Sequence, residues 1–457
     1  MKLYTTITIF LLVAGTALQA MADKEIHNST SSLVEEPGIF RTPQGIHFNP
    51  TCQPGQRYRI VAVGDILLHA PLQKQAAHTQ SFASLWRAFT PYFQQADMAY
   101  ANLEGPVAKG VDVYGRQVED PGANFDNKVY TSYPQFNYPF RLLDDLVKSG
   151  FDVVSTGNNH ALDRGSLGID RTIDALEKSG LQHTGFRRSD YQKWGKAGLS
   201  CSYDIHNLVN RKPWILTCSN RTLKQGFLEI DHSVESGIQW TAPPYPWQTI
   251  VRRNGLSVAW LACTYGTNAP DRNQQVLHCF KQAHEIKQLV ARLKDEVDAV
   301  LITPHWGKEN AITLQAEQVQ FAKEMLESGA LAILGSHPHT PQPIEKYLTK
   351  DGRETFILYS LGNFINGQHG TSQQSVMVLL LDLIKNSTTV NIQRVQFIPA
   401  FMTWTAHEIT LMPLQAGQAH AGLTHLLKVL PVENRAFFSQ DLPRDHQSPA
   451  CKADDVK

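Results

Sequence analysis

The feature that most constrains the fold is a repeated order of segments, in which an amphipathic segment is followed directly by a short apolar run. The chain reads "FRLLDDLVKSG" then "FDVVSTGNNH", later "KQAHEIKQLVARLKDEV" then "DAVLITPHWG", and next "AEQVQFAKEMLESG" then "ALAILGSHPH". We expect helical segments to end at Gly150, Gly180 and Gly329, because glycine readily adopts the left-handed conformation that closes a helix. Helices that alternate with apolar strands predict an α/β fold.

Further strands are expected on either side of this pattern. The run "YRIVAVGD" opens the folded domain, and residues 196–275, which are rich in Trp, Pro and Gly, favour a mostly β-structured region and a second sheet. Three more strand-like runs follow residue 354: "TFILYSLGNF", "SVMVLLLDLI" and "TVNIQRVQFIP". The sequence therefore predicts two sheets covered by helices, and beyond residue 404 only a short helix near "AGLTHLLKVL".

The N-terminus has the layout of a signal peptide. Lys2 precedes an apolar stretch from Ile7 to Leu18, and small residues stand just before Asp23. We expect export to the periplasm or the extracellular cell envelope, with cleavage near Asp23, although an uncleaved membrane anchor is an alternative for a stretch of this length. The expected organisation is a signal peptide over 1–22, a linker or arm over 23–54, a main domain over 55–404 and an extension over 405–457.

The number of cysteines favours disulfides, and the balance of charges argues against a nucleic-acid-binding protein. Six cysteines in an exported chain favour disulfides, with free buried thiols as the alternative. Sequence proximity favours the pairs Cys201–Cys218 and Cys263–Cys279, which leaves Cys52 to pair with Cys451. Lys plus Arg and Asp plus Glu number 42 each, so no overall field attracts nucleic acid, and an anionic substrate has to be bound locally.

Polar side chains follow five of the apolar runs, at the point where each predicted strand ends. Because ligands bind outside the carboxyl ends of strands in open α/β sheets, we expect one sheet to place them on a single rim. The candidate metal ligands and catalytic groups at these ends are Asp65, Asn102, Glu104, Asn159, His160, Asp163, His305, Glu309, His337 and His339.

The types of side chain indicate the ion. Carboxylate, amide and imidazole groups without thiolate suit Mn²⁺, Fe or Zn²⁺, with Mg²⁺ also compatible where oxygen ligands dominate. The set is larger than one tetrahedral ion needs, which predicts two divalent metal ions. Two-metal centres generate a hydroxide and stabilise both oxygens of an in-line displacement.

The motifs themselves resemble a known family. From about Tyr58 to Gln368 the stretches "GDILL", "NLE", "GNNHALDRG", "TYGTN", "HWGKE", "GSHPHTPQPIE" and "SLGNFINGQ" look like successive motifs of the CapA family of capsule and poly-γ-glutamate synthesis proteins. That family is related to the calcineurin-like metallophosphoesterases. The resemblance implies a four-layer α/β/β/α fold with a dinuclear centre.

The resemblance also implies roles for individual residues. It matches Asp65, Glu104, Asn159, His305, His337 and His339 to metal ligands, with Glu104 as the bridge between two ions. His160 matches the histidine that protonates the leaving group or steadies the phosphoryl oxygens.

The chain departs from the metallophosphoesterase pattern at the first metal site. The related enzymes open with Asp-x-His and use a Gly-Asp pair for the bridge, whereas this chain has Asp65-Ile66-Leu67 and Asn-Leu-Glu. Either His69 supplies the missing imidazole across the turn, or the first site is weak and fills only with substrate.

Other residues are candidates for supporting roles. Asp163 and Glu309 are expected either to bond ligand histidines from outside or to be ordinary acids at helix N-termini. We expect an anionic substrate to be bound by Arg164, Lys308 and Asn363, unless these side chains are simply solvated. The rim loops are expected to be shaped by Asn268 and Gly362.

These features favour an exported, metal-dependent, phosphoesterase-like hydrolase in the synthesis or export of an anionic capsule polymer such as poly-γ-glutamate. Its expected partners are the polymer or a phosphoester substrate and membrane-bound capsule-synthase subunits, with no nucleic acid. Two alternatives stay open: a non-catalytic envelope scaffold that binds polymer or synthase subunits, and a metal-dependent amide hydrolase of γ-glutamyl polymer.

Overall fold

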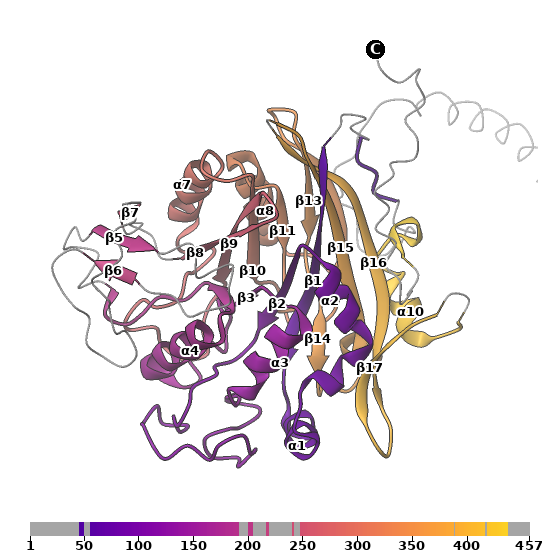
Figure 1. The fold of residues 1–457 in the computed structure, drawn as a ribbon. Coiled ribbons are helices and arrows are strands. Elements are labelled where there is room, and N and C mark those ends of the chain that lie inside the picture. The colour runs from indigo at the N-terminus through magenta and orange to yellow at the C-terminus, as the bar shows by residue number, and fades with distance from the viewer. Residues whose placement is uncertain are drawn as a thin grey trace, which may run out of the picture. The chain divides into compact units, whose positions relative to one another are not determined.

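A computed structural model describes residues 45–49, 55–191, 200–203, 216–218, 240–241, 247–387, 389–415 and 418–436. In it two β-sheets pack face to face, and helices cover the outer face of each (Figure 1). This is the four-layer α/β/β/α arrangement that the sequence predicts. The expected signal peptide and the residues Cys52 and Cys451 lie outside the described part of the chain.

The first sheet has eight strands in the order β17-β16-β15-β1-β2-β3-β4, with β14 paired to β1. Its members are β1 (Gln56–Leu67), β2 (Met98–Leu103), β3 (Val153–Ser155), β4 (Gln182–Thr184), β14 (Asn363–Asn366), β15 (Ser375–Lys385), β16 (Val390–Trp404) and β17 (Ile409–Pro413). Strands β1 to β4 run parallel to one another, whereas β15, β16 and β17 are antiparallel. Strand β1 is central and covered on both faces, which explains its unbroken apolar run.

Helices cover the outer face of this sheet and bury one apolar side on it. They are α1 (Ala70–Thr79), α2 (Thr90–Gln95), α3 (Arg141–Ser149) and α4 (Gly165–Ser179). In α3 the spacing of Leu142, Leu143 and Leu146 places all three side chains in the core. Both α3 and α4 end at the glycines expected from the sequence, Gly150 and Gly180, which have φ of 102° and 79°.

The second sheet has six strands in the order β12-β13-β11-β10-β9-β8. Its strands are β8 (Gln248–Arg253), β9 (Leu256–Thr264), β10 (Ala299–His305), β11 (Ala332–Leu334), β12 (Ile344–Leu348) and β13 (Glu354–Leu358). Its outer face is covered by α7 (Ala283–Leu293) and α8 (Ala316–Ser328), whose apolar side chains form one core with β9, β10 and β11. Helix α8 ends at the expected Gly329.

The inner faces of the two sheets form a shared apolar core. Tyr100 of β2 and Trp260 of β9 stack across it, with ring centroids 4.9 Å apart and planes 4° from parallel. Residues near both ends of the described chain also contribute to this core, among them Phe48 and Leu430. The sheets therefore cannot shift against each other without disturbing this packing.

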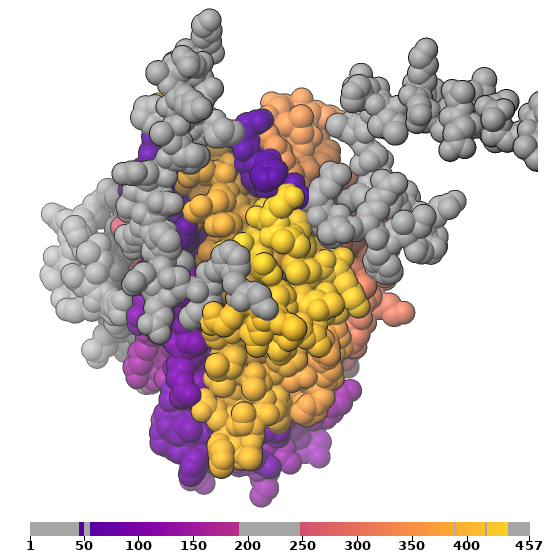
Figure 2. Space-filling model, turned by 90° about the vertical axis from the view of Figure 1, so that its right-hand side faces the viewer, coloured from indigo at the N-terminus to yellow at the C-terminus, as the bar shows by residue number. Residues whose placement is uncertain are grey.

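Two regions differ from the sequence expectation in detail. Residues 196–275 supply β8 and β9 to the second sheet, but β5 (Ser200–Tyr203), β6 (Leu216–Cys218) and β7 (Trp240–Thr241) form a separate three-stranded sheet. The first sheet continues past residue 404, because β17 pairs with β16. Helices α9 (Thr371–Gln374) and α10 (Ala421–Leu426) are the remaining described α-helices. Much of the face seen in Figure 2 is the C-terminal segment, drawn in orange and yellow.

The expectation that five strand ends share the rim of one sheet is wrong. Strands β1, β2 and β3 belong to the first sheet, and β10 and β11 belong to the second. The carboxyl ends still meet, because the two sheets stack with these ends on the same side. Periodicity along a chain cannot reveal this stacking, because a strand buried in either sheet reads alike. Among the described residues, no helix is both long and apolar enough to cross a membrane.

Candidate metal centre

The candidate ligands lie at the ends of strands from both sheets. Asp65 lies near the end of β1, Glu104 directly after β2, and His305 is the last residue of β10. Asn159 follows β3, while His337 and His339 follow β11. All six side chains are buried. The structure therefore brings together every residue that the sequence predicts as a metal ligand.

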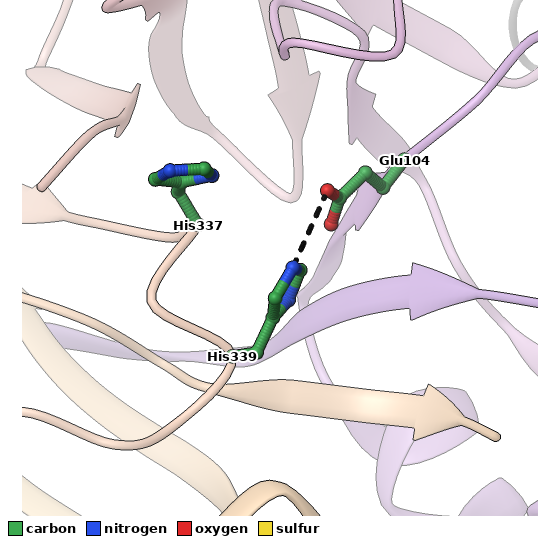
Figure 3. A group of neighbouring side chains, drawn as sticks. All are labelled: Glu104, His337 and His339. Carbon is green, nitrogen blue, oxygen red and sulfur yellow. Dashed lines mark ion pairs between the residues drawn. The ribbon is translucent and has the colours of Figure 1, made fainter. Parts of the chain in front are cut away.

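Two groups of three residues have potential ligand atoms within 4.8 Å of one another, and Glu104 belongs to both. One group is Glu104, His337 and His339, which point toward a common space in Figure 3. The other is Asp65, Glu104 and His305. A carboxylate shared by two groups has the placement required of a ligand that bridges two ions.

Glu104 provides the test of whether a cation fits here. Its side chain is fully buried, and neither carboxylate oxygen has a hydrogen-bond partner among the described residues. Burial by itself would raise the pKa of Glu104, but the neighbouring His339 and His305 outweigh it and lower the pKa well below its usual value. A buried, charged and unbonded carboxylate is costly unless a cation meets it. The residues present therefore fit a divalent metal ion.

The direct contacts pair these side chains differently from the two groups of converging ligand atoms, and they divide the cluster around Glu104 into two halves. The His305 half consists of Asn159, His305 and His337: the Nε2 atom of His305 lies 2.9 Å from Asn159 Oδ1 and 3.2 Å from His337 Nδ1. Ser336 Oγ lies 2.9 Å from the other ring nitrogen of His305 and orients the ring. Burial, with the nearby His305, lowers the pKa of His337 to about 2, so His337 is neutral at ordinary pH.

The Asp65 half consists of Asp65 and His339. Their side chains form an ion pair with 3.1 Å between His339 Nδ1 and Asp65 Oδ2, and Asn102 donates a 2.7 Å hydrogen bond to the other carboxylate oxygen. Burial lowers the pKa of His339, but the carboxylates of Glu104 and Asp65 more than offset this and raise it to about 9. Asn363, a predicted substrate-binding candidate, contacts His339 instead, with its Oδ1 3.1 Å from His339 Nδ1.

The loop that carries both histidines has an unusual backbone. His337 has φ of 97° and His339 has φ of 58°, in the left-handed region that residues other than glycine rarely adopt. Hydrogen bonds at its ends offset this strain, because Ser336 N donates to Pro304 O and Asn363 Nδ2 donates to His339 O. The fold thus fixes the loop that aims the two imidazoles at Glu104.

His160, the predicted catalytic residue, is oriented by Asp163. Its Nδ1 atom lies 2.8 Å from Asp163 Oδ2, which also accepts a 2.7 Å hydrogen bond from Phe136 N. Burial lowers the pKa of His160, but Asp163 outweighs burial and raises it above its ordinary value. Asp163 therefore bonds the candidate proton donor and not a ligand histidine. The Phe136 ring packs edge-on against His160, a contact that the sequence does not signal.

His69 lies beside the centre and takes no part in either group of converging ligands. Its Nδ1 atom accepts a 3.1 Å hydrogen bond from Gly367 N, and the ring packs against Phe136. Burial lowers the pKa of His69 to about 4. Asn102 and Ser336 hold the cluster in place from outside, and Ser336 could have been suspected from its position inside "GSHPH".

The remaining candidates have different surroundings. Arg164 is fully buried and donates to backbone carbonyls of Val111, Val129 and Asp163, so it supports a loop and does not face substrate. Lys308 and Glu309 are exposed on the rim. Gly362 has φ of 68° and closely approaches Pro341, while Asn268 contacts both Asn159 and His160.

Comparison with known families identifies relatives of the chain. The profile of the family described as bacterial capsule synthesis protein PGA_cap matches residues 59–201 and 242–368. "Capsule biosynthesis protein CapA" of Bacillus anthracis is 25% identical over 335 residues, which are 73% of this chain and 66% of that protein. "PGA biosynthesis protein CapA" of Bacillus subtilis (strain 168) is 24% identical over 330 residues, which are 71% and 68%. The chain thus spans about two thirds of the length of these relatives.

Solved structures with similar chains include the calcineurin-like phosphoesterase YfkN from Bacillus subtilis, with a TM-score of 0.36 and 13% identity over 76% of this chain and 91% of that one. A putative 5′-nucleotidase from Staphylococcus aureus gives a TM-score of 0.37 and 12% identity over 82% of this chain and 57% of that one.

Proposed function

The chain belongs to the PGA_cap family of bacterial capsule synthesis proteins, and we propose that it is an exported, metal-dependent hydrolase of the phosphoesterase type. Its proposed role is in the synthesis or export of an anionic capsule polymer such as poly-γ-glutamate. The observation that carries this proposal is the fully buried Glu104, whose two oxygens have no hydrogen-bond partner among the described residues and which lies between His305 at the end of β10 and His339 in the loop after β11.

The residues present define how two divalent ions would be bound. Glu104 together with the His305 half would bind one ion, and Glu104 together with Asp65 and His339 would bind a second. When bound, such ions supply a nucleophile at neutral pH and offset the charge that develops in an in-line displacement. Mn²⁺, Fe and Zn²⁺ match these ligands best.

The chain's own residues supply the proton transfer. Asp163 binds Nδ1 of His160, which leaves Nε2 as the ring nitrogen that can donate a proton to a leaving oxygen. Because Asp163 raises the pKa of His160, the donor form persists closer to neutral pH. Phe136 packs on this ring, which limits its motion and its contact with water.

Two other functions have some support. The lack of Asp-x-His, together with the bond from Gly367 to His69, favours a non-catalytic scaffold in which the centre only binds polymer or synthase subunits. Hydrolysis of the γ-glutamyl amide would use the same centre. A scaffold, however, does not need a buried proton donor such as the His160–Asp163 pair beside the ligands.

The test is a substrate screen with metal reconstitution. Metal-free protein is supplied with Mn²⁺ and assayed with a phosphomonoester, a phosphodiester and a γ-glutamyl peptide, with Glu104→Gln as the matched inactive variant. Mn²⁺-dependent ester hydrolysis that Glu104→Gln lacks supports the proposal. Hydrolysis of the γ-glutamyl peptide alone indicates the amide hydrolase, and no turnover despite bound metal indicates the scaffold.

Export rests on the N-terminal sequence and is tested separately. Mass spectrometry of the protein recovered from the cell envelope should give an N-terminus near Asp23. A retained Met1 or Lys2 would contradict cleavage and favour the anchored form. Crosslinking in the envelope should then capture membrane-bound capsule-synthase subunits, the proposed protein partners.

A further inference from the structure

A pocket of about 400 Å³ lies beside the metal centre, in the loop between β9 and α7. Its lining includes Asn268, Asp271, His278 and Lys281, together with the neighbouring residues of the stretch 266–270. None of these four residues is a candidate ligand of the metal centre.

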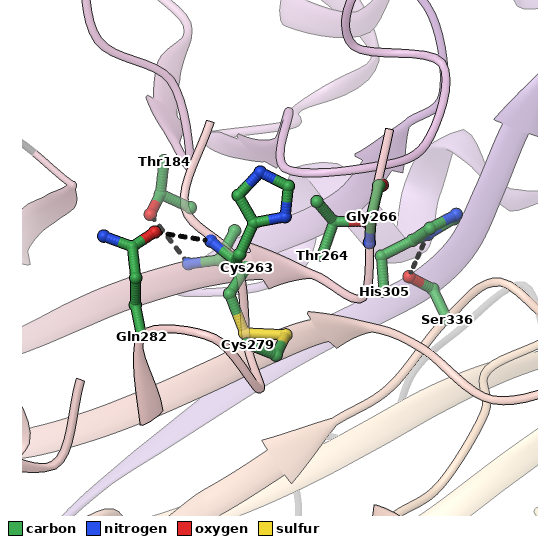
Figure 4. The surroundings of a disulfide bond; sticks show 10 residues. Thr184, Cys263, Thr264, Gly266, Cys279, Gln282, His305 and Ser336 are labelled. Atoms are coloured by element: carbon green, nitrogen blue, oxygen red, sulfur yellow. Dashed lines mark hydrogen bonds between the residues drawn. A yellow bond between two sulfur atoms is a disulfide. The ribbon is translucent and has the colours of Figure 1, made fainter. Parts of the chain in front are cut away.

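This loop is held in one conformation by covalent and hydrogen bonds. Cys263, in β9, and Cys279 are joined by the disulfide that their spacing favours, and the bond closes the loop at its base (Figure 4). Next to it Thr264 N donates to Leu277 O at 2.9 Å and Cys279 N donates to Thr264 O at 2.8 Å. Lys281 stands two residues after Cys279, so its backbone is fixed relative to the pocket.

The same loop touches the reaction centre. Asn268 N donates a 2.8 Å hydrogen bond to Asn159 O, and Asn268 Nδ2 lies 3.4 Å from His160 Nδ1. Asn268 thus lines the pocket and also contacts the candidate proton donor. If the substrate is a polymer, a group bound in the pocket would therefore belong to the monomer unit next to the bond that is cleaved.

The charges that line the pocket favour an anion. Asp271 is turned inward, where its two oxygens accept hydrogen bonds from Gln275 N at 2.8 Å and Val276 N at 2.9 Å. Lys281 is exposed and has no ion pair with any described residue. His278 lies 4.0 Å from Asp271, and its buried Nδ1 has no hydrogen-bond partner among the described side chains and backbone. The positive charge of Lys281 is the one left unsatisfied.

The lining also favours a carboxylate over a phosphate. A phosphate site usually combines several cationic or backbone N–H donors. Here Asn268 N already donates to Asn159 O, and the Gly266 N–H faces Thr264 Oγ1 at 3.3 Å. One ammonium group matches the single charge of a carboxylate.

We propose that this pocket binds a free carboxylate of the substrate, on the unit adjacent to the bond placed over the metal centre, with Lys281 as the residue that selects it. The inference rests on the proposed function, because it assumes that the substrate reaches Asn159 and His160. It adds that the protein recognises a carboxylate next to the reacting bond, and not only the reacting group itself.

The experiment measures binding and turnover separately. Fluorescence anisotropy with labelled γ-linked pentaglutamate, made from D- and from L-residues, is compared with the same peptide in which every free carboxylate is an amide. Wild-type protein should prefer the carboxylate form, and Lys281→Ala should weaken that binding by about 10-fold, as loss of a charge-assisted hydrogen bond does. Lys281→Arg should restore part of it. Lys287→Ala, which removes an exposed lysine from α7, should bind like wild type.

The outcomes separate the two proposals. Equal binding of the carboxylate and amide peptides, or unchanged binding by Lys281→Ala, overturns the pocket proposal even if the protein hydrolyses esters. A Lys281-dependent preference in a protein that turns over no ester overturns the hydrolase and leaves the pocket in place. Circular dichroism of Lys281→Ala checks that weaker binding does not come from misfolding.

Discussion

The two halves of the metal centre share Glu104 but differ in how their side chains are satisfied. In the Asp65 half an ion pair already exists, since His339 contacts Asp65 at 3.1 Å and its pKa is raised to about 9. In the His305 half, burial and the nearby His305 lower the pKa of His337 to about 2, so its imidazole is already in the neutral form that binds a metal ion. Metal ligands must be deprotonated, so an ion entering the Asp65 half has to displace a proton and break an ion pair.

For the two proposed ions, this difference predicts an order of binding. The His305 half, with Asn159 and Glu104, should take up the first ion, and the Asp65 half should bind a second ion more weakly. The Asp65 half is the site that lacks the Asp-x-His imidazole and is therefore expected to be weak. The Asp65–His339 ion pair is a second physical reason for weak binding there.

The largest effect is expected from Glu104→Gln, which removes the charge that both halves share. Both ions should bind more weakly by more than the roughly 10- to 100-fold that loss of an outer-shell partner typically costs. Isothermal titration of metal-free protein with Mn²⁺ measures this. Glu309→Gln, an exposed acid on the same rim, is the control and should match wild type. Two ions bound to Glu104→Gln at wild-type affinity would show that Glu104 is no ligand.

The next largest effect is expected from a variant of His160, which should change turnover and not metal binding. His160→Ala should leave the metal content of both halves unchanged, because Asn159 and not His160 contacts His305. Turnover in the ester assay should fall by roughly 10²- to 10⁴-fold, the usual contribution of a positioned acid or base. Metal analysis alongside the assay is the check. If metal content falls together with activity, His160 acts on the centre and not on substrate.

Single-histidine variants should distinguish the halves. His337→Ala should weaken the first ion by about 10- to 100-fold or more, whereas His339→Ala should weaken only the second. Second-ion binding in the wild type should also weaken as pH falls below about 9, since protonated His339 competes with the ion, while first-ion binding should change less. Titration with Mn²⁺ at several pH values measures both. Identical losses in the two variants would contradict the division.

The smallest effect on metal is expected from the double variant Cys263→Ser/Cys279→Ser. Opening a loop of this length should lower the free energy of unfolding by about 3 kcal/mol. First-ion affinity should fall by less than about 10-fold, because the loop contacts the His305 half outside its ligand atoms: Asn268 N donates to Asn159 O, Tyr265 N donates to His305 O, and the Tyr265 ring lies 4.5 Å from that of His337. Denaturant unfolding and Mn²⁺ titration measure the two effects. A larger loss in the Asp65 half would mean that the loop acts on the whole centre.

The sequence predicts the elements well because the signals are local. Apolar runs and closing glycines place β10, β11, α3 and α8, and the polar residues at the strand ends include the six candidate ligands that the resemblance to the CapA family then singles out. Strand β17 escapes notice because "ITLMP" is short and lies on a sheet edge. The division of the strand ends between two sheets also escapes, since it depends on stacking and not on periodicity.

The finer roles depend on tertiary contacts that no motif encodes. His69 stands close to Asp65 in sequence, yet Gly367, almost three hundred residues later, bonds its ring. Arg164 looks like a substrate-binding cation, but three backbone carbonyls of the surrounding loop accept its hydrogen bonds. The contact of Asp65 with His339 likewise arises only where the first sheet meets the loop after β11.

Anomalous diffraction from crystals of the protein grown with Mn²⁺ tests whether Glu104 is the shared ligand of two unequal metal halves. With less than one equivalent of Mn²⁺, we expect one anomalous peak between Glu104 and the His305 half, and with excess Mn²⁺ a second beside Asp65 and His339. A first peak at the Asp65 half would reverse the proposed order of binding, and no peak within bonding distance of Glu104 at any Mn²⁺ concentration would show that Glu104 is not a metal ligand.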